Sequence, residues 1–168
     1  MWRKLLIQGF SVVAFVENPE GGKPMIAGAN VIGVEFKDHE LKFNDEDLSP
    51  RTRNVTAVIM SLSKQASVYE KYNVDKHMFA LGLSVHPSYR GESLGGHILR
   101  ARENIGREYK IPATSTSFTS PISQKLAERV GFETLLERDY DQITDSQGNL
   151  AFPNIKEKTF KIMAKRLY

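Results

Sequence analysis

The amino-acid sequence predicts a mixed α/β domain, and three observations support this prediction. Runs rich in β-branched and aromatic residues alternate with segments whose apolar residues recur every three or four positions, which is the pattern of strands interleaved with helices. The 168 residues suffice for one compact domain. Hydrophobic residues make up 40% and charged residues 26% of the chain, as in ordinary globular proteins.

Composition also excludes several classes of function. With 23 Lys and Arg against 20 Asp and Glu, the net charge of +3 is too small for bulk electrostatic binding of nucleic acid. The absence of cysteine excludes disulfides, thiolate nucleophiles and cysteine-ligated zinc. The N-terminus lacks the apolar core of a signal peptide, and no apolar stretch approaches the roughly 20 residues that cross a bilayer. We therefore expect a cytoplasmic protein with no nucleic-acid or membrane partner.

The first elements are a short helix and a hairpin. Apolar residues at helical spacing precede Gly9, which is a natural helix end. The β-branched runs Ser11–Val16 and Met25–Lys37 flank a turn-forming stretch of Asn, Pro and Gly, so we expect an antiparallel hairpin. Gly28 and Gly33 inside the second strand indicate a bulge or a closely approaching neighbour.

An acidic segment and a helix follow. Asp38–Asp47 has five acidic residues, which fits a solvated loop better than a cation site, because metal-binding loops turn on a central glycine that is lacking here. We therefore expect no metal site. Ser49 and Pro50 are an N-cap and a first-turn proline, and apolar residues at three- and four-residue spacing extend the predicted helix to about Tyr69.

The remaining strands follow the same criteria. We expect strands at His77–Val85, Thr114–Phe118, Phe132–Tyr140 and Thr159–Leu167. Helices separate the first three of these strands. The chain order is therefore hairpin, helix, strand, helix, strand, helix and two final strands, which is a mixed α/β arrangement.

The segment with the clearest chemical meaning is Leu83–Tyr109, in which a strand leads through a glycine-rich loop into a helix. The loop contains Arg90, Gly91, Gly95 and Gly96. Such a junction gathers unpaired backbone N–H groups at the positive end of the helix dipole, which suits a phosphate. The spacing matches neither the P-loop nor the dinucleotide-binding fingerprint.

The helix after this loop has apolar residues at spacings of 4, 3, 4 and 4. This pattern predicts one buried face. Its residues are Leu94, Ile98, Ala101, Ile105 and Tyr109.

The pattern Val85-x-x-x-x-Arg90-Gly-x-x-Leu94-Gly95 resembles the pyrophosphate-binding motif of the GNAT superfamily of acetyl-CoA-dependent N-acetyltransferases. The superfamily has glycine at the position of Ser93. Serine is small and keeps its N–H, so we expect the change to be tolerated.

Downstream, Thr119–Phe132 resembles the second half of the superfamily domain. Together with Ala80–Gly96, it is most similar to the insect-type arylalkylamine N-acetyltransferases, whose acceptors include dopamine, tyramine and serotonin. The similarity begins near Trp2 and covers almost the whole chain. We therefore expect residues 1–168 to form a single N-acetyltransferase domain. We expect this domain to lack the N-terminal strand and helix of the family and, with them, the family's catalytic glutamate.

The resemblance implies a mostly antiparallel mixed sheet with splayed central strands and helices on both faces. It also implies acetyl-CoA as cofactor and direct attack by a small primary amine in a ternary complex. On this analogy the main chain near the strand end would bind pantetheine and the loop would bind pyrophosphate. The implied cofactor-binding residues are Leu83, Val85, Arg90, Gly91, Glu92, Ser93, Leu94, Gly95 and Gly96.

Catalytic roles are less defined. Ser123 matches a serine that insect-type enzymes place near the leaving thiolate, and Ser120 has either that role or the role of a helix N-cap. Glu35 is the nearest internal substitute for the missing glutamate, although an exposed strand carboxylate is the simpler interpretation. His77 and His86 flank the central strand, where we expect solvated or capping roles.

Two other functions stay open at this point. One is a CoA-binding relative that is catalytically impaired because it lacks the N-terminal segment. The other is a module that binds protein or nucleic acid through the basic C-terminal residues, although their alternation with apolar residues favours a strand face. These residues are Lys156, Lys158, Lys161, Lys165 and Arg166. Phe36, Phe43 and Tyr140 are either aromatic walls for an acceptor or core residues.

Overall fold

Six strands form one open sheet in a computed structural model that describes residues 2–39 and 48–168. The strand order is β1-β2-β3-β4-β6-β5. The strands are β1 (Val12–Val16), β2 (Met25–Phe36), β3 (Lys76–Val85), β4 (Ala113–Phe118), β5 (Glu133–Asp139) and β6 (Thr159–Arg166). Only the β3–β4 pair is parallel, so the mixed, mostly antiparallel sheet is confirmed.

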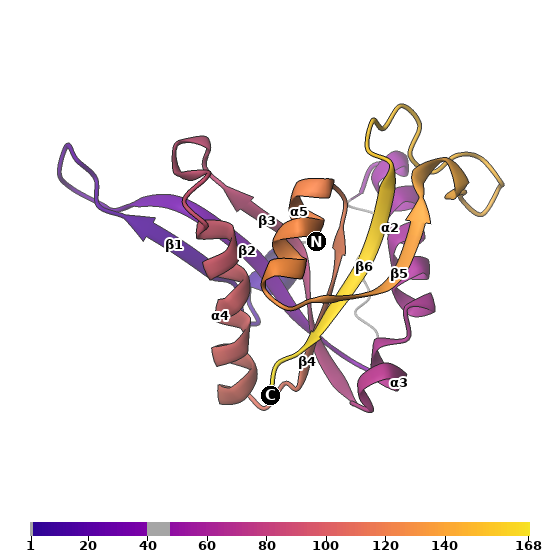
Figure 1. The fold of residues 1–168 in the computed structure, drawn as a ribbon, viewed down its shortest axis with the longest axis horizontal. Helices are drawn as coiled ribbons and strands as arrows, with labels where there is room; N and C mark the ends of the chain where they lie inside the picture. Colours follow the sequence, from indigo (N-terminus) through magenta and orange to yellow (C-terminus); the bar gives the residue numbers. More distant parts are fainter. Residues whose placement is uncertain (1, 40–47) are drawn as a thin grey trace.

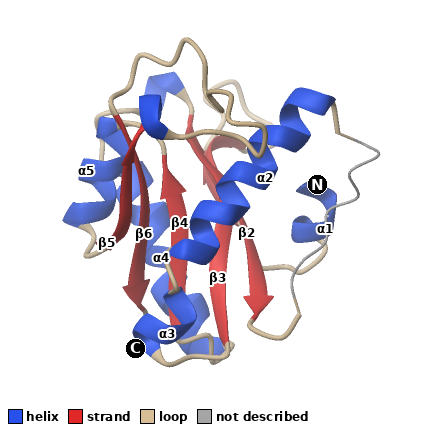
Figure 2. Ribbon diagram, turned by 90° about the vertical axis from the view of Figure 1, so that its right-hand side faces the viewer, coloured by secondary structure: helices blue, strands red, loops and turns tan. Residues whose placement is uncertain are grey.

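Helices cover both faces of this sheet, as expected. They are α1 (Trp2–Leu6), α2 (Pro50–Gln65), α3 (Val68–Tyr72), α4 (Leu94–Glu108) and α5 (Pro121–Arg129). Figure 2 shows α2 crossing the near face while α4 lies behind the strands, and Figure 1 shows α4 and α5 side by side. None of the helices in the described ranges is both long and apolar enough to cross a membrane.

The predicted hairpin is present, and its two glycines allow close approach of neighbours. A Cβ on Gly33 would lie 2.6 Å from a methyl of Leu5, so the glycine admits α1 onto the sheet. A Cβ on Gly28 would lie 2.8 Å from Ile98 of α4. The pairing of β2 with β3 also shifts by one residue at Leu81, which forms a bulge.

The central strands β3 and β4 diverge. They pair only at Met78 and Thr114, where the Thr114 hydroxyl donates to the Met78 carbonyl at 3.1 Å. Beyond this point their carboxyl ends separate, as Figure 1 shows. The splayed strands implied by the family resemblance are therefore confirmed.

The helix predicted to reach Tyr69 is interrupted. Ser49 caps α2 as expected, but α2 ends at Gln65 and Ser67 adopts a left-handed conformation with φ of 50°. This turn starts α3. The continuous apolar spacing concealed the break, because both helices bury apolar residues against the same sheet. Most of the acidic segment 38–47, including Phe43, lies outside the described residues.

Two of the basic C-terminal residues, Lys161 and Lys165, form ion pairs within the fold. Lys161 lies 3.5 Å from Glu128 and 3.6 Å from Glu137, and Lys165 donates to Glu103 at 2.6 Å. These charges are thus neutralised within the sheet and α4–α5 layer. The pairing supports the interpretation as a strand face over an interaction module.

Candidate active site

The loop between β3 and α4 presents a run of free backbone amides. After the single 3₁₀ turn Pro87–Tyr89, the N–H groups of residues 91–95 have no hydrogen-bond acceptor among the described residues. Residues 91–93 precede α4 and residues 94 and 95 lie in its first turn, where the helix dipole is positive. Five adjacent free donors at this end of a helix make a site for a phosphate-bearing ligand.

Two residues of this loop have positive φ angles. Gly91 has φ of 88° and a Cβ there would meet nothing within 4 Å, so the backbone is open to a ligand. Ser93 has φ of 61°, a left-handed conformation that glycine adopts more easily. The family glycine at this position therefore has a conformational reason, and the serine here is strained.

Gly95 and Gly96 lie where α4 contacts α5. A Cβ on Gly95 would lie 3.0 Å from Leu126 of α5, and one on Gly96 would lie 3.5 Å from the same side chain. The contact at Gly95 is tighter than an ordinary side-chain contact, so this glycine lets α4 pack closely against α5.

The main chain of Leu83 and Val85 faces the gap between the splayed strands. The His86 N–H donates to the Ala27 carbonyl of β2 at 2.8 Å. Main-chain groups of successive strand residues point to alternate sides, so those of Ser84 also point toward β2, whereas those of Leu83 and Val85 point away from β2. The Arg90 side chain folds back and donates from Nε to the Val85 carbonyl at 3.1 Å. Arg90 thus ties the loop to the strand end.

A cavity of about 530 Å³ lies on the opposite face of the sheet, beneath α2 and α3. Its wall includes Ala80 and Leu81 of β3 and Ser115–Ser117 of β4. These residues border the gap between β3 and β4 on both sides, so the cavity opens into the gap from the face that α2 and α3 cover. The amide loop lies at the carboxyl end of β3, at the end of the same gap. Apolar side chains complete the wall, among them Val55, Ile59, Met60 and Phe79.

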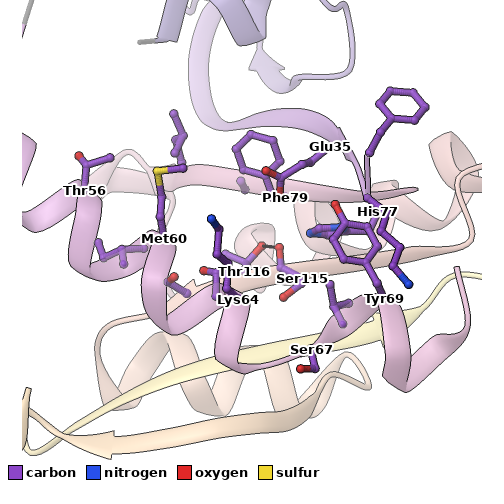
Figure 3. Close-up of a pocket in the computed structure, with 18 of the residues that line it drawn as sticks. Glu35, Thr56, Met60, Lys64, Ser67, Tyr69, His77, Phe79, Ser115 and Thr116 are labelled. Carbon is purple, nitrogen blue, oxygen red and sulfur yellow. Dashed lines mark hydrogen bonds between the residues drawn. The ribbon is translucent and has the colours of Figure 1, made fainter. Parts of the chain in front are cut away.

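Glu35 and His77 lie at one end of this cavity (Figure 3). They are paired across β2 and β3, so their side chains share a face. Glu35 is half-buried and therefore differs from the exposed strand carboxylate that the simpler interpretation predicted. His77 is buried, with its ring centroid 4.9 Å from that of Tyr69, so the solvated role expected for it is wrong.

The His77 imidazole is neutral. Burial lowers its pKa to about 4. Nδ1 is buried and has no hydrogen-bond partner among the described residues. Buried polar atoms are normally paired, so the ring has hydrogen-bonding capacity that the residues of the described ranges leave unused.

Ser120 and Ser123 form the N-terminal cap of α5. The Ser120 hydroxyl accepts from Ser123 N–H at 3.3 Å, and the Ser123 hydroxyl accepts from Ser120 N–H at 3.2 Å, a complete capping box. The capping role of Ser120 is therefore confirmed. Neither serine belongs to the described lining of the cavity. His86 likewise caps the 3₁₀ turn through its Nδ1.

The largest omission of the sequence analysis is Arg102. The buried face of α4 is centred on Ile98, Leu99 and Arg102, whereas Tyr109 of the predicted face is 56% exposed. The Arg102 guanidinium, 1% exposed, donates to Thr114 and Thr116 of β4 at 2.9 and 2.8 Å and to Asn30 of β2. It lies beneath the point where the central strands part.

Arg102 has no carboxylate partner within the described residues. Burial lowers its pKa to about 9. The Phe132 ring lies 5.8 Å from the guanidinium carbon and adds a cation–π contact. No sequence signal distinguishes this arginine from a solvated one, because its partners come from distant strands.

Of the three aromatic candidates, two are described. Phe36 lines the cavity and is 49% exposed. Tyr140 is 3% exposed and packs in the core against Phe152 and Phe160, which settles its role as a core residue. Burial raises its pKa to about 12.

Several solved structures that share this architecture are N-acetyltransferases. A protein named as insect arylalkylamine N-acetyltransferase 7 of the yellow fever mosquito Aedes aegypti is 32% identical, with a TM-score of 0.86 over 99% of this chain and 68% of that one. A mosquito arylalkylamine N-acetyltransferase-like protein, 5b, is 25% identical, with a TM-score of 0.81 over 97% and 77%. The Drosophila melanogaster polyamine N-acetyltransferase shares the fold at 19% identity, with a TM-score of 0.71 over 97% and 77%.

Neither a scan against models of protein families nor a search of curated proteins gave a match. The structural match nevertheless shows the family, since the relative at 32% identity aligns along nearly the whole chain and over two thirds of its own length. The chain therefore belongs to the insect arylalkylamine N-acetyltransferases, a family of GNAT acyltransferase enzymes.

Proposed function

We propose that this protein transfers the acetyl group of acetyl-CoA to the primary amine of a small arylalkylamine, by direct attack in a ternary complex. One observation carries the proposal. The gap between β3 and β4 has a cluster of free amides at one end and opens on its other side into a cavity with apolar and aromatic walls. This arrangement suits two ligands that meet across the sheet.

The residues of the loop fit coenzyme A. The free amides of residues 91–95 would bind the diphosphate, and the open backbone at Gly91 leaves room for its approach. Main-chain groups of Leu83 and Val85 would pair with the pantetheine amides in the manner of an added strand. The remaining members of the proposed set are Arg90, Glu92, Ser93, Leu94, Gly95 and Gly96.

The catalytic task is positioning and proton transfer. Acetyl-CoA, when bound, supplies the acetyl group as a thioester whose attack by an amine yields an amide and a free thiol. The chain has no cysteine, in keeping with transfer that needs no acyl-enzyme. We assign to Ser123, with Ser120 beside it, the donation of a hydrogen bond to the leaving sulfur. The Ser123 hydroxyl donates to the Ser120 carbonyl at 2.9 Å and would have to reorient for this.

The test uses the purified chain with acetyl-CoA and a panel of arylalkylamines, followed by thiol release. We expect release above the buffer rate for at least one amine. The absence of release for every amine would contradict the proposal. Binding of coenzyme A in calorimetry without turnover would instead identify a catalytically impaired relative. The strained backbone at Ser93 is the structural feature that suggests this alternative.

A further inference from the structure

The buried Arg102 side chain spans the region where β3 and β4 part. The last pair of these two strands comes two residues before Thr116 on β4 and four residues before Gly82 on β3. Thr116 and Gly82 therefore lie on opposite borders of the gap. The guanidinium is hydrogen-bonded to Thr116 directly and is connected to Gly82 through Asn30. One side chain of α4 thus links both borders of the gap.

Arg102 also fixes the orientation of the Asn30 amide. Both Nε and Nη2 of the guanidinium donate to the Asn30 side-chain oxygen. A guanidinium cannot accept a hydrogen bond, so a flipped amide would place its NH2 group against N–H donors. The amide therefore presents its NH2 group to the Gly82 carbonyl, to which it donates at 2.6 Å. Gly82 directly follows the bulge at Leu81, so this bond holds the part of β3 that borders the gap.

The bond to Thr116 holds the opposite border. The Thr116 hydroxyl accepts from Nη1 of Arg102 at 2.8 Å and donates to the Ser115 carbonyl at 2.7 Å. Both β4 residues belong to the wall of the cavity, and Figure 3 shows them there. Arg102 therefore acts on the cavity wall from the opposite face of the sheet.

The two linked borders carry the two proposed ligand sites. Leu83 and Val85, which would pair with pantetheine, follow Gly82 on β3. Ser115 and Thr116 belong to the cavity proposed for the amine. Attack of an amine on a thioester needs the two reacting atoms close together, and a misplacement of about 1 Å can lower a rate about 100-fold. The rate of transfer therefore depends on the width of the gap.

We propose that Arg102 is a positioning residue for acetyl transfer, which acts through Asn30 on β3 and through Thr116 on β4. This inference rests on the proposed function and deepens it. The hydrogen-bond network sets the distance between the two borders, and with it the place of the thioester relative to the amine. The Arg102 side chain is buried beneath the gap, so it acts through these neighbours and touches neither ligand.

The test separates the two links from the stability of the fold. Asn30→Asp keeps an acceptor for the guanidinium but removes the donor to the Gly82 carbonyl. Thr116→Val keeps the branched side chain and removes the acceptor on β4. Thr134→Val, at an exposed position of β5, is the matched control. Melting temperatures show where each variant is fully folded, and all rates are compared at such a temperature.

We expect kcat for the best amine of the panel to fall at least about tenfold in both Asn30→Asp and Thr116→Val. The KM for acetyl-CoA should change by less than about threefold, because the free amides of residues 91–95 still bind the diphosphate. Thr134→Val should keep both constants of the parent. A parent-like kcat in either folded variant, or a rise in KM alone, would overturn the inference. If Asn30→Asp does not fold, Thr116→Val decides.

Amide NMR with coenzyme A gives a second readout that does not need turnover. In the parent protein the amides of Leu83 and Val85 should shift on binding, together with those of residues 91–95. In Asn30→Asp the shifts at Leu83 and Val85 should differ from the parent, whereas those of residues 91–95 should follow it. Identical shifts at all these residues would overturn the inference. A parent protein that releases no thiol with any amine would count against the proposed function, and the NMR comparison would still decide the inference.

Discussion

The Arg102 guanidinium on α4 donates two hydrogen bonds to the side-chain oxygen of Asn30 on β2, at 3.1 Å from Nε and 2.7 Å from Nη2. Asn30 in turn donates to the Gly82 carbonyl at 2.6 Å, beside the bulge of β3. With the bonds to Thr114 and Thr116, this network joins β2, β3 and β4 beneath the divergence. The divergence of β3 and β4 is thus stabilised by the buried charge of Arg102, whose hydrogen-bond partners are all neutral side chains.

Replacement of Arg102 by lysine should lower the free energy of unfolding by about 2 kcal/mol, because one ammonium nitrogen with three N–H groups cannot replace the four hydrogen bonds that the guanidinium donates from three nitrogens. Urea denaturation measures the change. Arg129→Lys, at the exposed end of α5, is the matched control and should stay within about 0.5 kcal/mol of the parent. Equal stability of Arg102→Lys and the parent protein would show that the network is not a brace.

Ser93→Gly should stabilise the fold. The left-handed backbone of Ser93 favours glycine, and relief of its strain should exceed the entropy that glycine adds to the unfolded chain, for a net gain of about 1 kcal/mol. At this chain length the melting temperature should rise by roughly 2–4 °C. Gly91→Ala, with φ of 88° at that residue, should lower it. A lower melting temperature for Ser93→Gly contradicts this interpretation of the loop.

His77 makes stability depend on pH. Its pKa is about 4 in the folded protein against an ordinary value of 6.5, so the unfolded chain binds the additional proton between these values. The free energy of unfolding should therefore fall by about 3 kcal/mol from this residue as the pH drops from 6.5 to 4. The contribution of this residue to the slope fades over about one pH unit above 6.5, where the imidazole becomes neutral in the unfolded chain too. His77→Phe should remove this part of the dependence, and an unchanged slope in the variant would exclude His77 as its source.

Kinetic measurements distinguish the proposed catalytic role of Ser123 from its structural role in the helix cap. Loss of its side chain from the capping box should cost about 1 kcal/mol of stability in either case. If the hydroxyl also assists the leaving sulfur, Ser123→Ala should lower kcat about 100-fold, and Ser123→Thr should recover part of the loss. A stability loss with unchanged kcat would restrict Ser123 to the cap.

Local chemistry was enough to predict most elements. The pairs Ser49-Pro50 and Ser120-Pro121 marked two helix starts, and alternation marked β6 to within one residue. These features depend on neighbouring residues only. The break at Ser67 was missed because apolar spacing continues across it, while tertiary packing decides where the backbone turns.

Features that depend on distant residues could not be derived from periodicity. The free amides after β3 followed from the strand–loop–helix pattern, and the splayed strands followed only from the family resemblance. The cavity requires α2, α3 and three strands together, so the burial of Glu35 and His77 had no local signal. The same holds for Arg102, whose acceptors come from β2 and β4.

The most direct test of the account is an amide NMR titration of the protein with coenzyme A. Because the free N–H groups of residues 91–95 are assigned to the diphosphate, their resonances should shift the most and follow one saturating curve. Amides remote from the gap, such as those of β5, should not move with them. Saturable binding that leaves residues 91–95 unshifted, or no binding at all, would contradict the central claim.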